Sequence, residues 1–149
     1  MNGNTLTPTY IPSIADITNG GVVLSLIATP VAPCSGNITD AMQLTITRTP
    51  VVFAGTDAAI CPPGSYTVAD ATASYCAALL WSSSGTGVFS STSTLVTIYS
   101  PSPADIANGT VTLTLTGYAN SPCTNVSDEV VLYFVAEAQA NAGTDAVIC

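Results

Sequence analysis

The sequence predicts an all-β fold built of β-sandwich units in tandem. Two observations predict this: apolar and polar residues alternate along several segments, and one eight-residue motif occurs twice. The motif reads AGTDAAIC at 54–61 and AGTDAVIC at 142–149, and the two copies start 88 residues apart. This period exceeds the roughly 20–50 residues of solenoid repeats and is close to the size of one small sandwich domain. We therefore expect each repeat to be a whole domain.

A second pair of related segments extends the repeat. Residues 6–34 match residues 95–123, with Tyr10 opposite Tyr99 and Asp16 opposite Asp105. If each unit opens near AGTDA, residues 1–50 are the C-terminal part of a preceding repeat, 51–139 a complete repeat and 140–149 the first strand of the next. The chain is then a fragment of a longer protein. Residues 1–50 lack opening strands and should expose an unpaired edge that frays, packs on 51–139 or borrows 140–149 from another copy.

The alternation predicts where strands lie. In 110–116, Val111, Leu113 and Leu115 alternate with threonines, the pattern of a half-buried strand. Glycine, proline, serine and asparagine clusters separate further candidate strands, as in an all-β sandwich. These candidates are 22–26, 41–47, 51–60, 65–70, 77–83, 94–99, 129–136 and 142–148. No long helix is expected, although 13–20 and 103–109 can each form one helical turn or a corner. The single tryptophan, Trp81, is expected in the core.

Composition excludes several classes of function. Only 7% of residues are charged, the formal net charge is −8, and Arg48 is the one base. Nucleic acids and anionic membranes are therefore not expected as partners, because phosphate recognition requires lysine and arginine. No run of 18 apolar residues exists, so no membrane insertion is expected. The chain has no histidine, lysine or G-x-S-x-G motif, and we expect no enzyme activity.

The order of short motifs resembles a known family. It runs AGTDA, GSYTV at 64–68, LLWSSSGTGVFS at 79–90, PADIANGTVTLTL at 103–115 and SDEVVLYF at 127–134. This order is similar to the PKD-like (polycystic kidney disease-type) repeats in large secreted surface adhesins and gliding-associated proteins of Bacteroidota. The resemblance implies an immunoglobulin-like sandwich, type IX secretion and an extracellular place on the cell surface. It also implies a structural or adhesive role as a stalk or spacer. One departure is that glycine, threonine and glycine replace the usual acidic turn after the tryptophan, at 85–87.

Five cysteines in a chain expected to be exported predict disulfides. Cys61 with Cys123 is the preferred pair, and closing a loop of roughly 60 residues stabilises a domain by about 4 kcal/mol. Strand polarity argues against it, because the end of the first strand and the loop before the last lie at opposite ends of such a sandwich. Cys76 with Cys123, other pairings and free thiols remain open. Cys34 and Cys149 are expected to pair with cysteines of the longer protein that lie outside residues 1–149.

The acidic residues are the remaining candidates for a site. Asp57, Asp128 and Glu129 lie near the expected domain junction and could supply oxygen ligands to calcium, the one candidate metal in a chain for which we expect no cofactor. The favoured interpretation is structural, with aspartates capping backbone amides in turns. A zinc site is not expected without C-x-x-C spacing or histidine.

The alternative function is a carbohydrate-binding or calcium-binding sandwich. Tyr118, beside the loop that holds Cys123, is the most plausible exposed aromatic contact for a glycan. Neighbouring repeats of the same chain are the expected partners, together with surface glycans or other cells.

Overall fold

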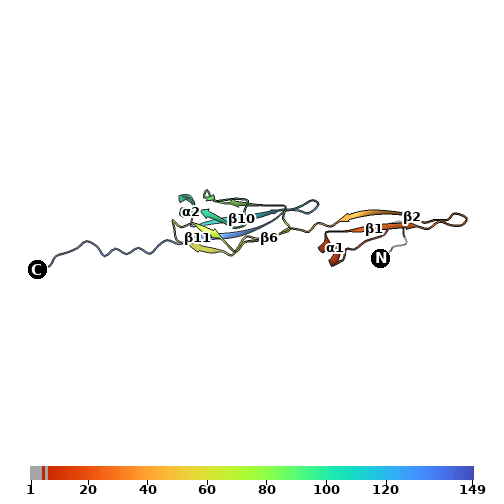
Figure 1. The fold of residues 1–149 in the computed structure, drawn as a ribbon. Helices are drawn as coiled ribbons and strands as arrows, with labels where there is room; N and C mark the ends of the chain where they lie inside the picture. The colour runs from red at the N-terminus through yellow and green to blue at the C-terminus, as the bar shows by residue number, and fades with distance from the viewer. Residues whose placement is uncertain (1–4, 6) are drawn as a thin grey trace.

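The computed structural model describes residue 5 and residues 7–149. In that part of the chain it consists mainly of β-strands with two short helices, so the all-β prediction is confirmed. Figure 1 shows three parts arranged in a line: an N-terminal hairpin, a central domain and an extended C-terminal segment. None of the helices in the described residues is long and apolar enough to cross a membrane.

The N-terminal part consists of α1 (Ile14–Asn19), β1 (Gly21–Ala28) and β2 (Ile38–Thr45). Ser13 caps the start of α1, and Gly20 ends the helix with a φ of 77°, a conformation that glycine adopts without strain. β1 and β2 form an antiparallel pair in which Gly21 lies opposite Thr45. The short helical turn expected in this region is therefore present.

The central domain contains nine strands and the second helix. In chain order these are β3 (Val51–Phe53), β4 (Ala58–Ile60), β5 (Tyr66–Val68), β6 (Thr72–Ser74), β7 (Ala78–Ser83), β8 (Val88–Phe89), β9 (Thr97–Ser100), α2 (Pro103–Asn108), β10 (Thr110–Tyr118) and β11 (Val126–Phe134). The largest sheet has the order β4-β11-β10-β7, the second β5-β9-β8, and β3 pairs with β6. β4 runs parallel to β11, whereas the other pairs are antiparallel.

Side chains from both larger sheets form one core. Trp81 of β7 is 1% exposed, which confirms its predicted place, and its indole N–H donates to the Thr94 carbonyl oxygen at 3.1 Å. The Phe89 ring lies between Trp81 and Tyr99, with centroids 6.0 and 5.0 Å away. The alternating residues of β10 and β11 complete the core: Val111, Leu113, Leu115, Val130 and Leu132.

The structure corrects three details of the predicted strands. The expected strand at 51–60 is two strands, because its first part, β3, pairs with β6 and its second part, β4, pairs with β11. The change of partner occurs at Gly55, whose φ is 108°. β6 and β8 were not predicted, since each is so short that no alternation is visible. The strand expected at 142–148 is not formed, because a ladder requires a partner and these residues extend away from the domain (Figure 1).

The two related hairpins have the same register but different burial. Leu26 lies opposite Asp40 in β1–β2, and Leu115 lies opposite Asp128 at the corresponding positions of β10–β11. Leu26 is nevertheless 63% exposed, whereas Leu115 is fully buried. The local sequence thus sets the pairing, and burial depends on the other strands of the unit.

Arg48 joins the hairpin to the domain. Its Nη1 donates to the Tyr75 hydroxyl at 2.6 Å, and its guanidinium carbon lies 4.7 Å from the centroid of that ring. Its Nε donates to the carbonyl oxygen of Ile17 in α1 at 3.3 Å. The Thr47 hydroxyl also donates to the Ser121 carbonyl oxygen of the domain at 3.4 Å. The single base therefore bridges the two parts.

Truncating a core leucine should destabilise the domain strongly. We expect Leu115→Ala to lower the free energy of unfolding by about 2–5 kcal/mol, because a fully buried side chain leaves a cavity. The control is Leu80→Ala, at a position 39% exposed in β7, which should cost less than about 1–2 kcal/mol. Urea unfolding followed by Trp81 fluorescence measures both, and equal losses would contradict this assignment of the core.

Candidate functional site

The repeated AGTDA motif is the segment that closes the domain. Ala54 is fully buried, and its backbone N–H donates to a carboxylate oxygen of Asp128 in β11 at 2.8 Å. In return, the backbone N–H of Val131 donates to Asp57 Oδ1 at 2.9 Å. These two hydrogen bonds fasten the motif to β11 just before the β4–β11 ladder begins.

Asp70 holds the middle of the same motif. Its Oδ2 accepts hydrogen bonds from both the backbone N–H and the hydroxyl of Thr56, each at 2.9 Å. These bonds lower the pKa of Asp70 below its usual value. A Cβ at Gly55 would come within 2.5 Å of Asp70 Oδ1, so this position has no room for a side chain. Ala54, Gly55, Thr56 and Asp57 thus each have a structural reason in this motif.

Asp105 is a buried carboxylate, 2% exposed, at the first turn of α2. It accepts from the backbone N–H groups of Ser102, Thr86 and Gly87, each at 2.9 Å. The Tyr99 hydroxyl donates to it as well, at 2.8 Å. Four neutral donors therefore surround this charge, and no base takes part. The prediction that the aspartate of the turn at 103–109 binds backbone amides is confirmed.

The donors decide the ionisation of Asp105. Burial by itself raises the pKa of this carboxyl group, but the hydrogen bonds from Ser102, Thr86, Tyr99 and Gly87 outweigh it and lower the pKa to about 2. The group is thus ionised in the folded protein down to strongly acidic pH.

The glycines at 85 and 87 fit closely around this carboxylate. A Cβ at Gly85 would collide with Asp105, and one at Gly87 would come within 2.5 Å of the Tyr99 hydroxyl oxygen. The sequence shows that the acidic residue expected in this turn is missing. The structure shows that Asp105, which lies later in the chain, supplies a carboxylate to the same turn. Sequence reasoning did not foresee this contact.

Asp16, the counterpart of Asp105, has part of the same arrangement. The Tyr10 hydroxyl donates to Asp16 at 2.6 Å, and the backbone N–H and hydroxyl of Ser13 donate at 2.8 and 2.7 Å. These hydrogen bonds lower the pKa of Asp16, and the bond to Asp16 raises the pKa of Tyr10. No loop corresponding to 85–87 covers Asp16 among the described residues, so this copy is more exposed.

The three candidate calcium ligands are not brought together. Asp57 and Asp128 each accept a backbone N–H, as described above. Asp128 and Glu129 are neighbours in β11, so their side chains point to opposite faces of the sheet. Glu129 instead accepts from the Thr114 hydroxyl at 3.4 Å. Within residue 5 and residues 7–149, no three acidic, cysteine or histidine side chains are grouped as metal ligands.

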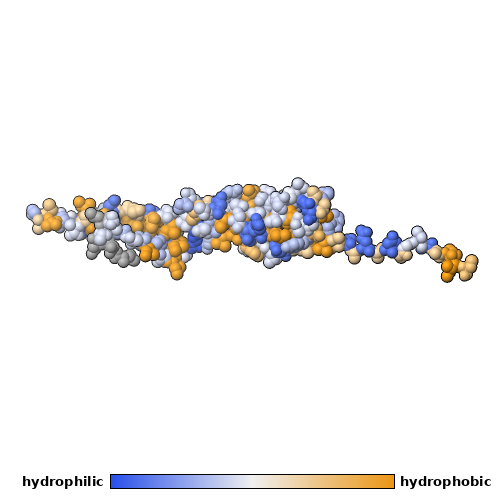
Figure 2. All heavy atoms as spheres, turned by 180° about the vertical axis from the view of Figure 1, so that it is seen from behind, coloured by the Kyte–Doolittle hydropathy of each residue, from blue (hydrophilic) through white to orange (hydrophobic). Residues whose placement is uncertain are grey.

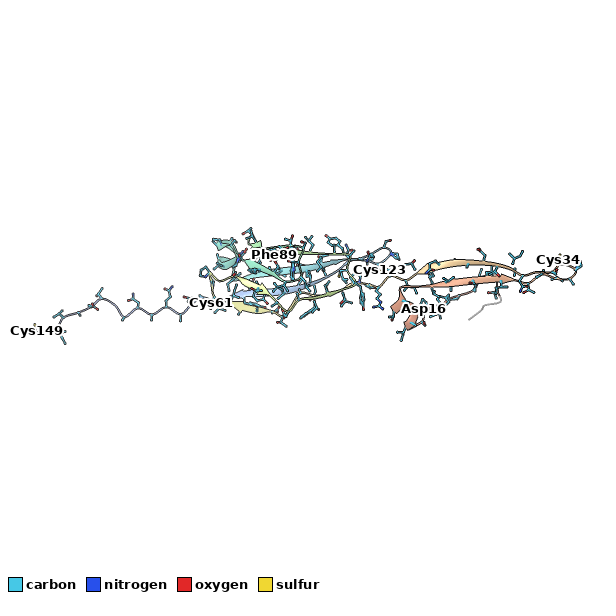
Figure 3. All side chains as sticks on the ribbon, in the orientation of Figure 1. Asp16, Cys34, Cys61, Phe89, Cys123 and Cys149 are labelled. Carbon is cyan, nitrogen blue, oxygen red and sulfur yellow. The ribbon has the colours of Figure 1, made fainter. Side chains whose placement is uncertain are left out.

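The preferred disulfide, between Cys61 and Cys123, is not formed. Cys61 follows β4, which runs parallel to β11, whereas Cys123 precedes β11. The nine residues of β11 therefore separate the two cysteines by about 30 Å, far beyond the roughly 7 Å that a disulfide allows. Figure 3 shows them at opposite ends of the domain. All five cysteines of the chain are free thiols in this structure.

The tyrosines differ widely in exposure. Tyr99 is buried and Tyr66 half-buried, whereas Tyr118, the candidate glycan contact, is 38% exposed at the end of β10. Tyr75 is 49% exposed, but its hydroxyl and ring are already engaged by Arg48. Sequence reasoning missed this contact, although the presence of only one base in the chain was a signal.

Acid should remove a defined part of the domain's stability. The folded pKa of Asp105 is about 2, below the ordinary 3.8, so its contribution is complete above about pH 4 and is lost as the pH falls towards 2. The shift corresponds to about 2 kcal/mol. We expect Asp105→Asn to lower stability at pH 7 by about 1–3 kcal/mol and to flatten this acid dependence, because the amide places donors against donors.

The control for this prediction is Asp16→Asn, at the half-buried counterpart of Asp105 in the hairpin. Thermal unfolding of the wild type and both variants between pH 2 and 7, followed by Trp81 fluorescence, measures the effect. The assignment is contradicted if the acid dependence of Asp105→Asn is as steep as that of the wild type.

No protein-family model matches the chain, and a search of curated proteins finds no match.

Proposed function

We propose that residues 51–139 form an immunoglobulin-like, PKD-like repeat unit of a large extracellular surface protein. In this proposal the protein is secreted by a type IX route, and its units serve as a stalk or spacer that presents an adhesive tip. The unit carries load and performs no reaction. Its partners are the neighbouring units of the same chain, and the parent protein contacts surface glycans or other cells.

The observation that carries this proposal is the parallel pairing of β4 with β11. The chain enters the domain at one end and leaves it at the other (Figure 1). Tension along the chain pulls the motif before β4 in one direction and the end of β11 in the other. Because the hydrogen bonds between parallel strands lie across this direction, they are loaded together rather than one after another. This geometry resists extension.

The contacts of Asp57 and Asp128 add to the same resistance. Both hydrogen bonds join the AGTDA motif to β11, so both must break before the strands can slide apart. Opposite ends for entry and exit also suit a stalk, since each added unit extends the chain. The hairpin, which lies in line with the domain, has the register of β10–β11 and supports a head-to-tail series of such units.

Single-molecule pulling of the whole chain between terminal handles tests this role. We expect Asp128→Ala to lower the unfolding force of the domain, because it removes a bond between the sliding strands. Asp70→Ala is the matched control, since Asp70 also accepts from the motif but holds it to the loop after β5 rather than to β11.

Both substitutions should reduce equilibrium stability by about 1–3 kcal/mol. Only Asp128→Ala should lower the unfolding force markedly. Equal losses of force in the two variants, or a wild-type domain that extends without a distinct force peak, would count against the proposed mechanical role.

A further inference from the structure

One edge of β2 is free in the described part of the chain. β2 pairs with β1 alone, whereas its counterpart β11 pairs with β10 on one side and β4 on the other. Several apolar side chains of the hairpin are exposed, among them Leu26 at 63% and Met42 at 58%. These two residues also line an open hollow of about 650 Å³. Figure 2 shows hydrophobic atoms on the surface of this part of the molecule.

The C-terminal segment is a near copy of the strand that fills this edge in the domain. Residues 142–149 differ from 54–61 only in having Val147 where the domain has Ala59. In the present structure they extend away from the domain without a partner strand, and Val147 and Ile148 are 100% and 92% exposed. The segment and the free β2 edge lie at opposite ends of the molecule (Figure 1), so the segment can only reach the β2 of another copy.

The domain supplies the register for such a contact. In β4–β11, Ala58 lies opposite Leu132 and Ile60 opposite Phe134. The two copies of the motif start 88 residues apart. Adding this number to the β4 positions and subtracting it from the β11 positions places Ala146 opposite Leu44 and Ile148 opposite Ile46. The same transfer turns each of the domain's strand contacts into a contact between two copies.

The two hydrogen bonds between the motif and β11 also have counterparts in this register. The bond from the Ala54 N–H to Asp128 becomes a bond from the Ala142 N–H to Asp40, and the bond from the Val131 N–H to Asp57 becomes one from the Gln43 N–H to Asp145. The side-chain carboxylates of Asp40 and Asp145 make no hydrogen bond or ion pair with the described residues of their own copy. Both aspartates are thus available for the contact.

The register also brings two cysteines to one place. Continuing the transferred ladder by one residue sets Cys149 of one copy opposite Thr47 of the next. Cys123 of that next copy already points at this residue, since its Sγ lies 3.5 Å from the Thr47 carbonyl oxygen. Cys61, the counterpart of Cys149, lies correspondingly beside Val135, whose N–H donates to the Ile60 carbonyl oxygen at 3.0 Å.

We propose that residues 142–149 of one copy add as a parallel strand to the β2 edge of a second copy, and that Cys149 then forms a disulfide with Cys123 of that copy. The proposal rests on the head-to-tail arrangement proposed above. In the linking step the two thiols lose two protons and two electrons, and one S–S bond forms. A small disulfide such as oxidised glutathione accepts the electrons and protons and is cleaved to two thiols.

Oxidation of the whole chain with oxidised glutathione tests the link. Non-reducing electrophoresis should show a ladder of covalent oligomers, and mass spectrometry of proteolytic fragments should join Cys149 to Cys123. Cys149→Ser and Cys123→Ser should each abolish the ladder. The matched controls are Cys61→Ser and Cys34→Ser, which replace the sequence counterparts of these two cysteines and should leave the ladder intact.

Two further variants separate strand addition from random collision. Asp145→Ala should slow cross-linking about tenfold, because it removes the hydrogen bond to Gln43. Glu137→Ala removes the same charge from the extended residues between β11 and the segment, and it should not slow the reaction. If copies met only by collision, both substitutions would speed the reaction equally, because each reduces the repulsion between chains of net charge −8.

Hydrogen exchange in reductant completes the test. Strand addition should protect the amides of 146–148 and 44–46 as protein concentration rises. Cross-links through Cys34 or Cys61 in similar yield, a ladder that survives Cys123→Ser, or no protection at any concentration would overturn the proposal. None of these results alters the unfolding force of the domain, because the load-bearing strands belong to one copy. Failure here is thus distinguishable from failure of the mechanical role.

Discussion

The reciprocal attachment of the AGTDA motif to β11 is the constraint on which the rest of the structure depends. One hydrogen bond runs from the motif to Asp128, and another runs from β11 to Asp57 of the motif. Between them, Ala54 enters the core and the chain changes from one strand partner to another. The same contacts join the motif to β11, support the proposed mechanical role and show which strand is missing at the edge of β2.

The sequence predicted those features that local pattern controls. The alternation of threonines with apolar residues located β10, and the single tryptophan marked the core. The segment at 103–109 indicated a short helical turn, which the structure contains as α2. The short β6 and β8 could not be found, because two or three residues carry no period. The strand expected at 142–148 had the right residues, but a strand also needs a neighbour, and that depends on the surroundings rather than on the segment.

The candidate site was less predictable than the fold. The spacing of the cysteines alone gives no information on the direction of β4. The expected strand polarity argued against pairing Cys61 with Cys123, and the parallel pairing of β4 with β11 does set them apart. The carboxylates were recognised as structural, but their partners were not, because Asp105 bonds to a turn 18 and 19 residues earlier in the chain. Contacts of this kind follow from the packing of the two sheets and leave little trace in a single sequence.

The surroundings of Asp105 have a consequence for the conditions in which the domain remains folded. Its charge is held by neutral N–H and O–H dipoles within hydrogen-bonding distance, not by a cation. Dissolved ions screen attraction between separated surface charges, but they do not reach a carboxylate that is shielded from solvent. The contribution of Asp105 to stability should therefore change little with salt concentration.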